Sequence, residues 1–378
     1  MERARTPGNF EQLWDAWLQV RERNACAGVD GVTVRAYERN ARPWLLRLAD
    51  VLRKGAYQPR PLVEFSIPKP TGGERLLAIP TVSDRIVQRA ALDALEPFLE
   101  PSFLTCSYAF RRGRSVQQAV LAVSGLRTSG YDWVAHVDIR DCFDSIDWRF
   151  LLERLKPFAQ PALRLLIRKW IEAPRVRAAR QPEGRGIPQG GVISPALCNL
   201  VLTSFDTAIT RAGIPLVRYA DDCLLFARSE REARGVLLVA RDALREVKLE
   251  PNIQKSEVTS FSEGFRYLGT LFVKTIVLPC IRVKTDSGKT VYVSGYEGNA
   301  GPRKPKVRAY RERGHITVAG GLDERSLERL AAKAMLDETR GTSTALGRAL
   351  MEAYRRELKK TAAKQKQSRP AGVVALIP

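Results

Sequence analysis

The clearest pattern of apolar and polar positions lies over residues 215–226, where two short apolar runs flank a short polar segment. The first run ends at Tyr219 and the second continues from Leu224. Two strand-like runs interrupted in this way predict a β-hairpin. The adjacent residues Asp221 and Asp222 are then expected at the tip of the hairpin, on a rigid turn.

The same pattern predicts both helices and strands along the rest of the chain. An apolar run over 133–138 predicts a strand ending at Asp138, and alternation over 290–294 predicts another. Helical spacing predicts helices over 90–99, from Ser194 onward, and over 322–338 and 344–361. This mixture predicts an α+β fold.

Adjacent carboxylates at a hairpin tip cost Coulomb energy, which a divalent cation with oxygen ligands commonly offsets. A solvated acidic turn is the usual alternative for an isolated Asp-Asp pair. Asp138, at the end of a predicted strand upstream, would complete a shared Mg²⁺ site beside Asp221. Between them, the glycines of 184–199 allow close approach by a ligand such as a nucleotide, or form a structural turn.

Taken in order, these segments resemble the reverse transcriptases of the bacterial group II intron class. The likeness is carried by residues 24–33, 65–80, 84–90, 107–115, 133–146, 184–199, 215–226, 249–256 and 264–269. It implies a right-hand polymerase with fingers and palm over 1–278, built from an antiparallel sheet and helices. A basic thumb or X-like region over 279–365, largely helical after 320, and a flexible tail over 366–378 are expected to follow.

The resemblance implies that Asp138, Asp221 and Asp222 are the catalytic carboxylates. They would hold two Mg²⁺ ions, or Mn²⁺ in their place, and the backbone carbonyl of Ile139 would join them. The ions would activate the primer 3′-hydroxyl and neutralise the departing pyrophosphate.

Five further residues are implied to contact the incoming nucleotide. Lys69 and Arg75 would grip its triphosphate, although in isolation they would be ordinary surface charges. Phe143 would exclude a ribose 2′-hydroxyl, with a core aromatic as the alternative. Gln189 would contact the nascent pair or template. Lys255 would lie near the pyrophosphate, with a solvated lysine as the alternative.

Charge agrees with a partner that carries many phosphates. The chain has 62 Lys and Arg against 41 Asp and Glu, a net charge of +21. Residues 281–378 hold 21 basic and 10 acidic residues, so about half of the excess lies there. In this part Arg348, Arg355 and Lys359 lie off an apolar helical stripe. They are candidates for binding an RNA/DNA hybrid, or else form a solvated helix face.

The remaining composition limits the class of protein. The six cysteines have no paired spacing and only two histidines accompany them, which supports neither a zinc site nor a disulfide framework. The charged start predicts no signal peptide, and no apolar stretch reaches membrane-spanning length. We therefore expect a soluble cytoplasmic protein without a membrane partner.

The predicted activity is RNA-directed DNA synthesis from an RNA template, a DNA or RNA primer and dNTPs. The chain has no recognisable endonuclease segment, and 281–320 does not match an intron thumb. A domesticated role is therefore expected, either in CRISPR spacer acquisition with a Cas1/Cas2-type integrase or in antiphage defence with a noncoding RNA. The alternative is an intron maturase, but RNA binding alone does not need clustered carboxylates that repel phosphate.

Overall fold

The structure is a computed structural model that describes residues 2–68, 74–176, 183–273, 276–279, 281–285, 290–293, 308–312 and 315–319. The chain divides into two compact units, Met1–Thr259 and Ser260–Pro378. This boundary lies upstream of residue 278, where the sequence places the end of the palm. The functional division at 278 stays a prediction.

The first unit combines helices and strands, which confirms the predicted α+β class. Its helices are α1 (Phe10–Arg23), α2 (Val34–Glu38), α3 (Ala41–Arg53), α4 (Val82–Leu99), η1 (Glu100–Ser102), α5 (Val116–Thr128), α6 (Cys142–Ser145), α7 (Trp148–Leu155), α8 (Pro161–Ile171), α9 (Ser194–Arg211) and α10 (Glu230–Glu246). Its strands are β1 (Leu62–Pro68), β2 (Glu74–Ile79), β3 (Trp133–Asp138), β4 (Arg175–Val176), β5 (Leu216–Tyr219), β6 (Asp222–Ala227) and β7 (Glu257–Ser260).

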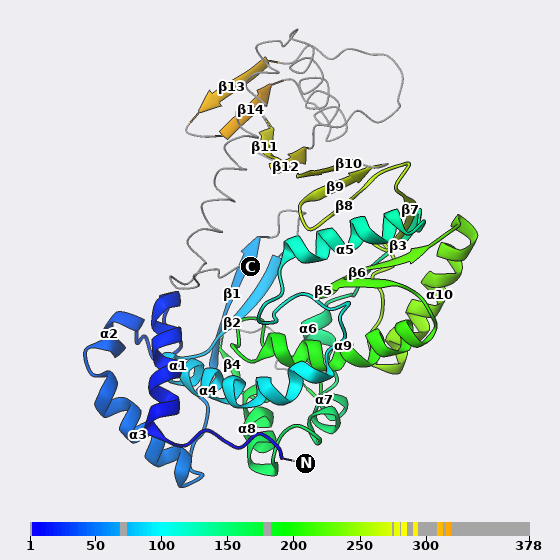
Figure 1. The fold of residues 1–378 in the computed structure, drawn as a ribbon. Helices are drawn as coiled ribbons and strands as arrows, with labels where there is room; N and C mark the ends of the chain where they lie inside the picture. The colour runs from blue at the N-terminus through cyan, green and yellow to red at the C-terminus, as the bar shows by residue number, and fades with distance from the viewer. Residues whose placement is uncertain are drawn as a thin grey trace, which may run out of the picture. The chain divides into compact units, whose positions relative to one another are not determined.

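A four-stranded sheet in the order β5-β6-β3-β7 carries the predicted carboxylates. Strands β5 and β6 form the predicted hairpin, and β6 also pairs antiparallel with β3. After Asp222, every residue of β6 is buried, as expected for a strand covered on both faces. Helices α9 and α10 contact each other, and α10 also contacts β3 and β6 (Figure 1).

Helix α9 begins at Ser194, where the sequence predicts a helix start. Pro195 occupies the first turn, a position at which its missing N–H costs nothing. Most of the helix is buried, including Leu197 and Phe205, so α9 belongs to the main hydrophobic core. A helix buried on so many sides lies inside the core rather than on its surface.

A second sheet, in the order β2-β1-β4, includes parts of the segment 65–80, which carries part of the resemblance. Strands β1 and β2 make an antiparallel hairpin in which Ile67 pairs with Arg75. The segment 69–73 that joins them, which contains Lys69, lies outside the described residues. The predicted helix over 90–99 is confirmed as part of α4.

The second unit contains short strands in its described part. They are β8 (Phe265–Tyr267), β9 (Thr270–Val273), β10 (Ile276–Pro279), β11 (Ile281–Thr285), β12 (Thr290–Val293), β13 (Arg308–Glu312) and β14 (His315–Ala319). They form two sheets, β10-β9-β8 and β12-β11-β14-β13. Strand β12 confirms the predicted strand at 290–294, whereas the predicted helices over 322–338 and 344–361 lie outside the described residues.

Candidate active site

The carboxylates meet where three strand ends come together. Asp138 is the last residue of β3 and pairs in register with Asp222, the first residue of β6. Asp221 lies in the two-residue turn between β5 and β6, and its carbonyl accepts a hydrogen bond from Ile139 N at 3.3 Å. The other turn residue, Ala220, has a φ of +62°. The hairpin tip and the strand end are both confirmed.

A cavity of about 950 Å³ opens at this point. Its lining includes every predicted site residue of the described chain: Arg75, Asp138, Ile139, Phe143, Gln189, Asp221, Asp222 and Lys255. These residues come from elements between β2 and the loop after α10. Their predicted roles require one shared site, and the fold places them around one cavity.

The three carboxylates have different surroundings. Burial raises the pKa of Asp221, and the charges of Asp138 and Asp222 raise it further, while Arg75 lowers it. Lys255 Nζ lies 3.6 Å from Asp138 Oδ2, although its side chain is 56% exposed. The site thus concentrates negative charge at Asp221, and an exposed lysine lies beside Asp138.

Asp222 has a partner that the sequence did not suggest. His136 Nε2 lies 2.6 Å from Asp222 Oδ1, diagonally across the β3–β6 pair. Burial lowers the pKa of His136, but the hydrogen bond and charge of Asp222, with Glu257 and Asp138, outweigh burial and raise it overall. The sequence assigns His136 no role in the site. Its position two residues before Asp138, on the same strand face, was the available signal.

The donor set fits a hard cation such as Mg²⁺. Asp138 and Asp221 would supply carboxylate oxygens, and Ile139, which lines the same cavity, would supply a backbone carbonyl. Within the described ranges, no three His, Cys, Asp or Glu side chains converge closely enough to form a metal-binding group by themselves. An ion held here would therefore take further oxygen ligands from water or substrate, as Mg²⁺ commonly does.

Phe143 and Gln189 lie on neighbouring segments of the cavity wall. Phe143, on α6, lines the cavity and is also partly buried against the main core, so its two predicted roles are compatible in space. Gln189 Nε2 donates to Asp144 Oδ2 at 2.9 Å. The carbonyl of Gln189 accepts from Ala78 N at 2.8 Å, which ties the glycine-rich loop to β2.

Gly190 in this loop serves the protein's own packing. A Cβ at Gly190 would lie 2.8 Å from the carbonyl oxygen of Ala78, and the φ of Gly190 is +128°. Close backbone approach is therefore real, but the partner at Gly190 is strand β2. This outcome favours the structural-turn alternative at that position.

Four predicted residues cannot be placed. Lys69, Arg348, Arg355 and Lys359 all lie outside the described residues. Arg75, the predicted partner of Lys69, is exposed on β2 at the cavity. In the described part of the chain, no helix is both long and apolar enough to cross a membrane.

Comparison with known proteins gives consistent similarities. Residues 67–272 match the family model described as reverse transcriptase (RNA-dependent DNA polymerase). Protein YkfC of Escherichia coli (strain K12) is 32% identical over 298 residues, which cover 65% of this chain and 76% of YkfC. Group II intron-encoded protein LtrA of Lactococcus lactis subsp. cremoris is 31% identical over 163 residues, which cover 42% of this chain and 27% of LtrA.

A solved structure described as a partial Cas6-RT-Cas1–Cas2 complex is also similar. It is 28% identical, with a TM-score of 0.39, over 63% of this chain and 40% of that chain. A superposition this loose carries no argument about assembly. The matched family region contains Asp138, Asp221 and Asp222, together with Arg75 and Lys255.

Proposed function

The chain belongs to the reverse transcriptase (RNA-dependent DNA polymerase) family and is of the group II intron type, and from this premise we propose that the cavity at Asp221 is its polymerase active site. There a primer 3′-hydroxyl would attack the α-phosphate of an incoming dNTP paired to an RNA template. The observation that carries the proposal is the convergence of Asp138, Asp221 and Arg75 on one cavity.

Asp138 and Asp221, with the carbonyl of Ile139, would hold two Mg²⁺ ions. Once bound, the ions would lower the pKa of the primer hydroxyl and neutralise charge on the triphosphate and the departing pyrophosphate. The high charge density at Asp221 supports this role, because a divalent cation offsets the repulsion that Asp138 and Asp222 exert on it. Asp222 would act beside them while His136 holds one of its oxygens.

The basic residues of the cavity would bind the triphosphate. The guanidinium of Arg75 is planar and can donate two parallel hydrogen bonds to phosphate oxygens. Lys69, as the resemblance implies, would add a point charge. Lys255 lies near Asp138 and would reach the pyrophosphate end of the nucleotide. Its pairing with Asp138 is exposed and weak, so the lysine can exchange the carboxylate for a phosphate group.

Asp138→Asn and Asp221→Asn test the assignment. Each should abolish primer extension with Mg²⁺ on an RNA template while template binding stays near wild type, because the carboxylates attract cations and not phosphate. Asp242→Asn, an exposed carboxylate on α10, is the matched control and should extend normally. Wild-type extension by either site variant would contradict the assignment.

We also propose that the polymerase serves CRISPR spacer acquisition or antiphage defence. The support is the stretch 281–320, which does not resemble an intron thumb. Neighbouring genes test this role: an integrase gene or CRISPR array supports the first and a structured noncoding RNA supports the second. A surrounding intron RNA would contradict both and favour a maturase, for which the similarity to LtrA is the supporting observation.

A further inference from the structure

A fully buried arginine lies directly behind the carboxylate turn. Arg218 is on β5, three residues before Asp221, and its side chain is 0% exposed. Burial lowers the pKa of Arg218, but the charge of Asp206 outweighs burial and raises the pKa overall. The side chain is therefore a permanent charge inside the protein, and such a charge requires hydrogen-bond partners.

The five N–H donors of Arg218 meet five acceptors. Nε and Nη2 donate to the two carboxylate oxygens of Asp206, at 2.7 and 2.6 Å. Nη1 donates to Asn199 Oδ1 and to the carbonyl oxygen of Ala220, each at 3.0 Å. Nη2 also donates to Ser107 Oγ at 2.8 Å. The hydrogen-bonding capacity of the guanidinium is completely used.

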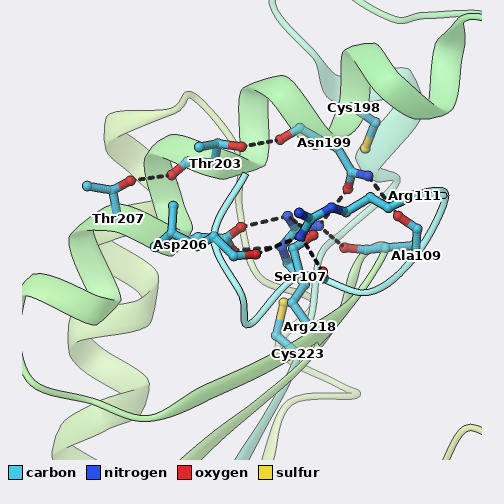
Figure 2. Close-up of polar contacts among 12 residues, drawn as sticks. Ser107, Ala109, Arg111, Cys198, Asn199, Thr203, Asp206, Thr207, Arg218 and Cys223 are labelled. Carbon is cyan, nitrogen blue, oxygen red and sulfur yellow. Dashed lines mark hydrogen bonds and ion pairs between the residues drawn. The ribbon is translucent and has the colours of Figure 1, made fainter. Parts of the chain in front are cut away.

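These partners tie the turn to distant parts of the fold. Asn199 and Asp206 are on α9, and Ser107 is in the loop before α5. Figure 2 shows the side chains of this network. The same loop also pairs with the main chain, because Arg218 N donates to the carbonyl of Cys106 at 2.8 Å. Arg218 is thus held by helix α9 and by the loop before α5.

The contact with Ala220 reaches the active site itself. The φ of +62° puts Ala220 in the left-handed region, which is strained for a residue with a Cβ. Its carbonyl belongs to the peptide bond that joins Ala220 to Asp221. A donor fixed on that oxygen therefore fixes the plane of the peptide from which Asp221 begins.

Stability alone does not explain this arrangement. A buried ion pair is often no more stabilising than apolar side chains of similar volume. An apolar pair at Arg218 and Asp206 could fill the same space, but it could not hold the Ala220 carbonyl.

We propose that Arg218 is a positioning residue that aims Asp221 into the catalytic cavity through its hydrogen bond to the Ala220 carbonyl. The proposal rests on the proposed polymerase function of that cavity. Arg218 touches no reacting atom, so its effect should appear in the placement of Asp221 and of the metal that Asp221 would bind.

The test replaces both charges together. Arg218→Met with Asp206→Leu leaves no unpaired buried charge, so the double variant should fold. Its melting midpoint should be lower than wild type, because Asn199, Ser107 and the Ala220 carbonyl each lose a donor. Its kcat for single-nucleotide addition should fall by about ten- to a hundredfold, because small displacements of a catalytic group have effects of that size. The KM for dNTP and the affinity for template should stay within about twofold of wild type.

Two measurements without turnover follow the placement of Asp221 directly. Half-saturation by Mn²⁺, measured by electron paramagnetic resonance without nucleic acid, should move to higher concentration in the double variant. Hydrogen exchange at the amides of Asp221 and Asp222 should become faster. Arg218→Lys should give smaller changes in the same measurements. It keeps the positive charge beside Asp206 but loses the planar guanidinium and its several fixed donors.

Thr203→Val is the matched control. Thr203 Oγ1 donates to the carbonyl of Asn199 at 2.8 Å, beside the network in Figure 2, but does not reach the turn. This variant should behave as wild type in every measurement. A folded double variant with wild-type kcat and Mn²⁺ binding overturns the positioning role, provided Asp221→Asn is inactive. If Asp221→Asn is itself active, the proposed polymerase site fails instead.

Discussion

At the scale of single residues, the adjacent carboxylates Asp221 and Asp222 are chemically different. Asp221 lies in the turn, where burial and two neighbouring carboxylates raise its pKa. Asp222 begins a strand and shares a hydrogen bond with His136. Sequence adjacency therefore does not imply equal roles, and Asp221 is the better placed of the two to bind a cation.

Phe143 gives a prediction at this scale. If its ring excludes the ribose 2′-hydroxyl, Phe143→Ala should markedly raise ribonucleotide incorporation, while dNTP incorporation drops only modestly, because a clash is removed and no ligand is lost. Competitive incorporation of matched rNTP and dNTP measures the change. Phe150→Ala is the control, since Phe150 is also partly buried against the core but does not line the cavity. Equal discrimination in both variants would make Phe143 a core residue only.

The residues that the sequence could predict are those with a local signal. Asp221 and Asp222 interrupt an apolar hairpin, and Asp138 ends an apolar run, so short windows reveal them. Arg218 lies inside such a run, and its proposed role depends on Asp206, 12 positions away, and on Ser107, 111 positions away. No periodicity reports that kind of contact.

At the scale of elements, the site depends on the joint between the glycine-rich loop and β2. The hydrogen bond from Ala78 N to the Gln189 carbonyl joins the β1–β2 hairpin to the cavity wall. The sequence predicted glycines suited to close approach, but it could not show whether the approaching partner was a ligand or a strand. At Gly190 the approaching partner is a strand, because the atom nearest to an added Cβ is the carbonyl oxygen of Ala78 on β2.

Gly190→Ala tests this joint. The added Cβ would lie 2.8 Å from the Ala78 oxygen at a φ of +128°, so the loop must separate from β2. The free energy of unfolding should fall by at least about 1–3 kcal/mol from backbone strain alone. The KM for dNTP should also rise as Gln189 shifts. Chemical denaturation and single-nucleotide kinetics measure the two effects.

Gly213→Ala is a control that adds backbone strain without displacing a neighbouring strand. Gly213 has a φ of +73° with no atom within 4 Å of an added Cβ. Its substitution should cost about 1–2 kcal/mol without changing the KM for dNTP. An unchanged KM in Gly190→Ala would show that the joint is structural and does not affect the nucleotide site.

At the scale of the whole molecule, charge is the property that the sequence reports most directly. The net charge of +21 requires no knowledge of the fold, and it agrees with a family that handles nucleic acid. The order of the elements in the first unit was also accessible, because the motifs follow one another along the chain. The strand register that brings Asp138 opposite Asp222 was not, since it depends on long-range pairing.

The basic C-terminal part is expected to bind the RNA/DNA hybrid. An A-form RNA/DNA hybrid is held mainly through its backbone and shape, so contacts there should be independent of sequence. Replacing Arg348, Arg355 and Lys359 by Gln should shorten products and weaken hybrid binding about equally for all sequences. The salt dependence of binding should decrease by up to about three units if all three contact phosphate.

The control removes the same charge elsewhere, through Arg231→Gln, Arg234→Gln and Arg245→Gln on the exposed face of α10. If net charge alone attracted the hybrid, the two triple variants would lose equal affinity. If the C-terminal residues contact the hybrid directly, the C-terminal variant should lose more affinity and processivity than the α10 variant. Single-nucleotide addition at saturating primer-template should survive in both, because the carboxylate site is untouched. Wild-type processivity and salt dependence in the C-terminal variant would leave those residues as a solvated face, and the duplex would then have to be gripped by other basic residues of the chain.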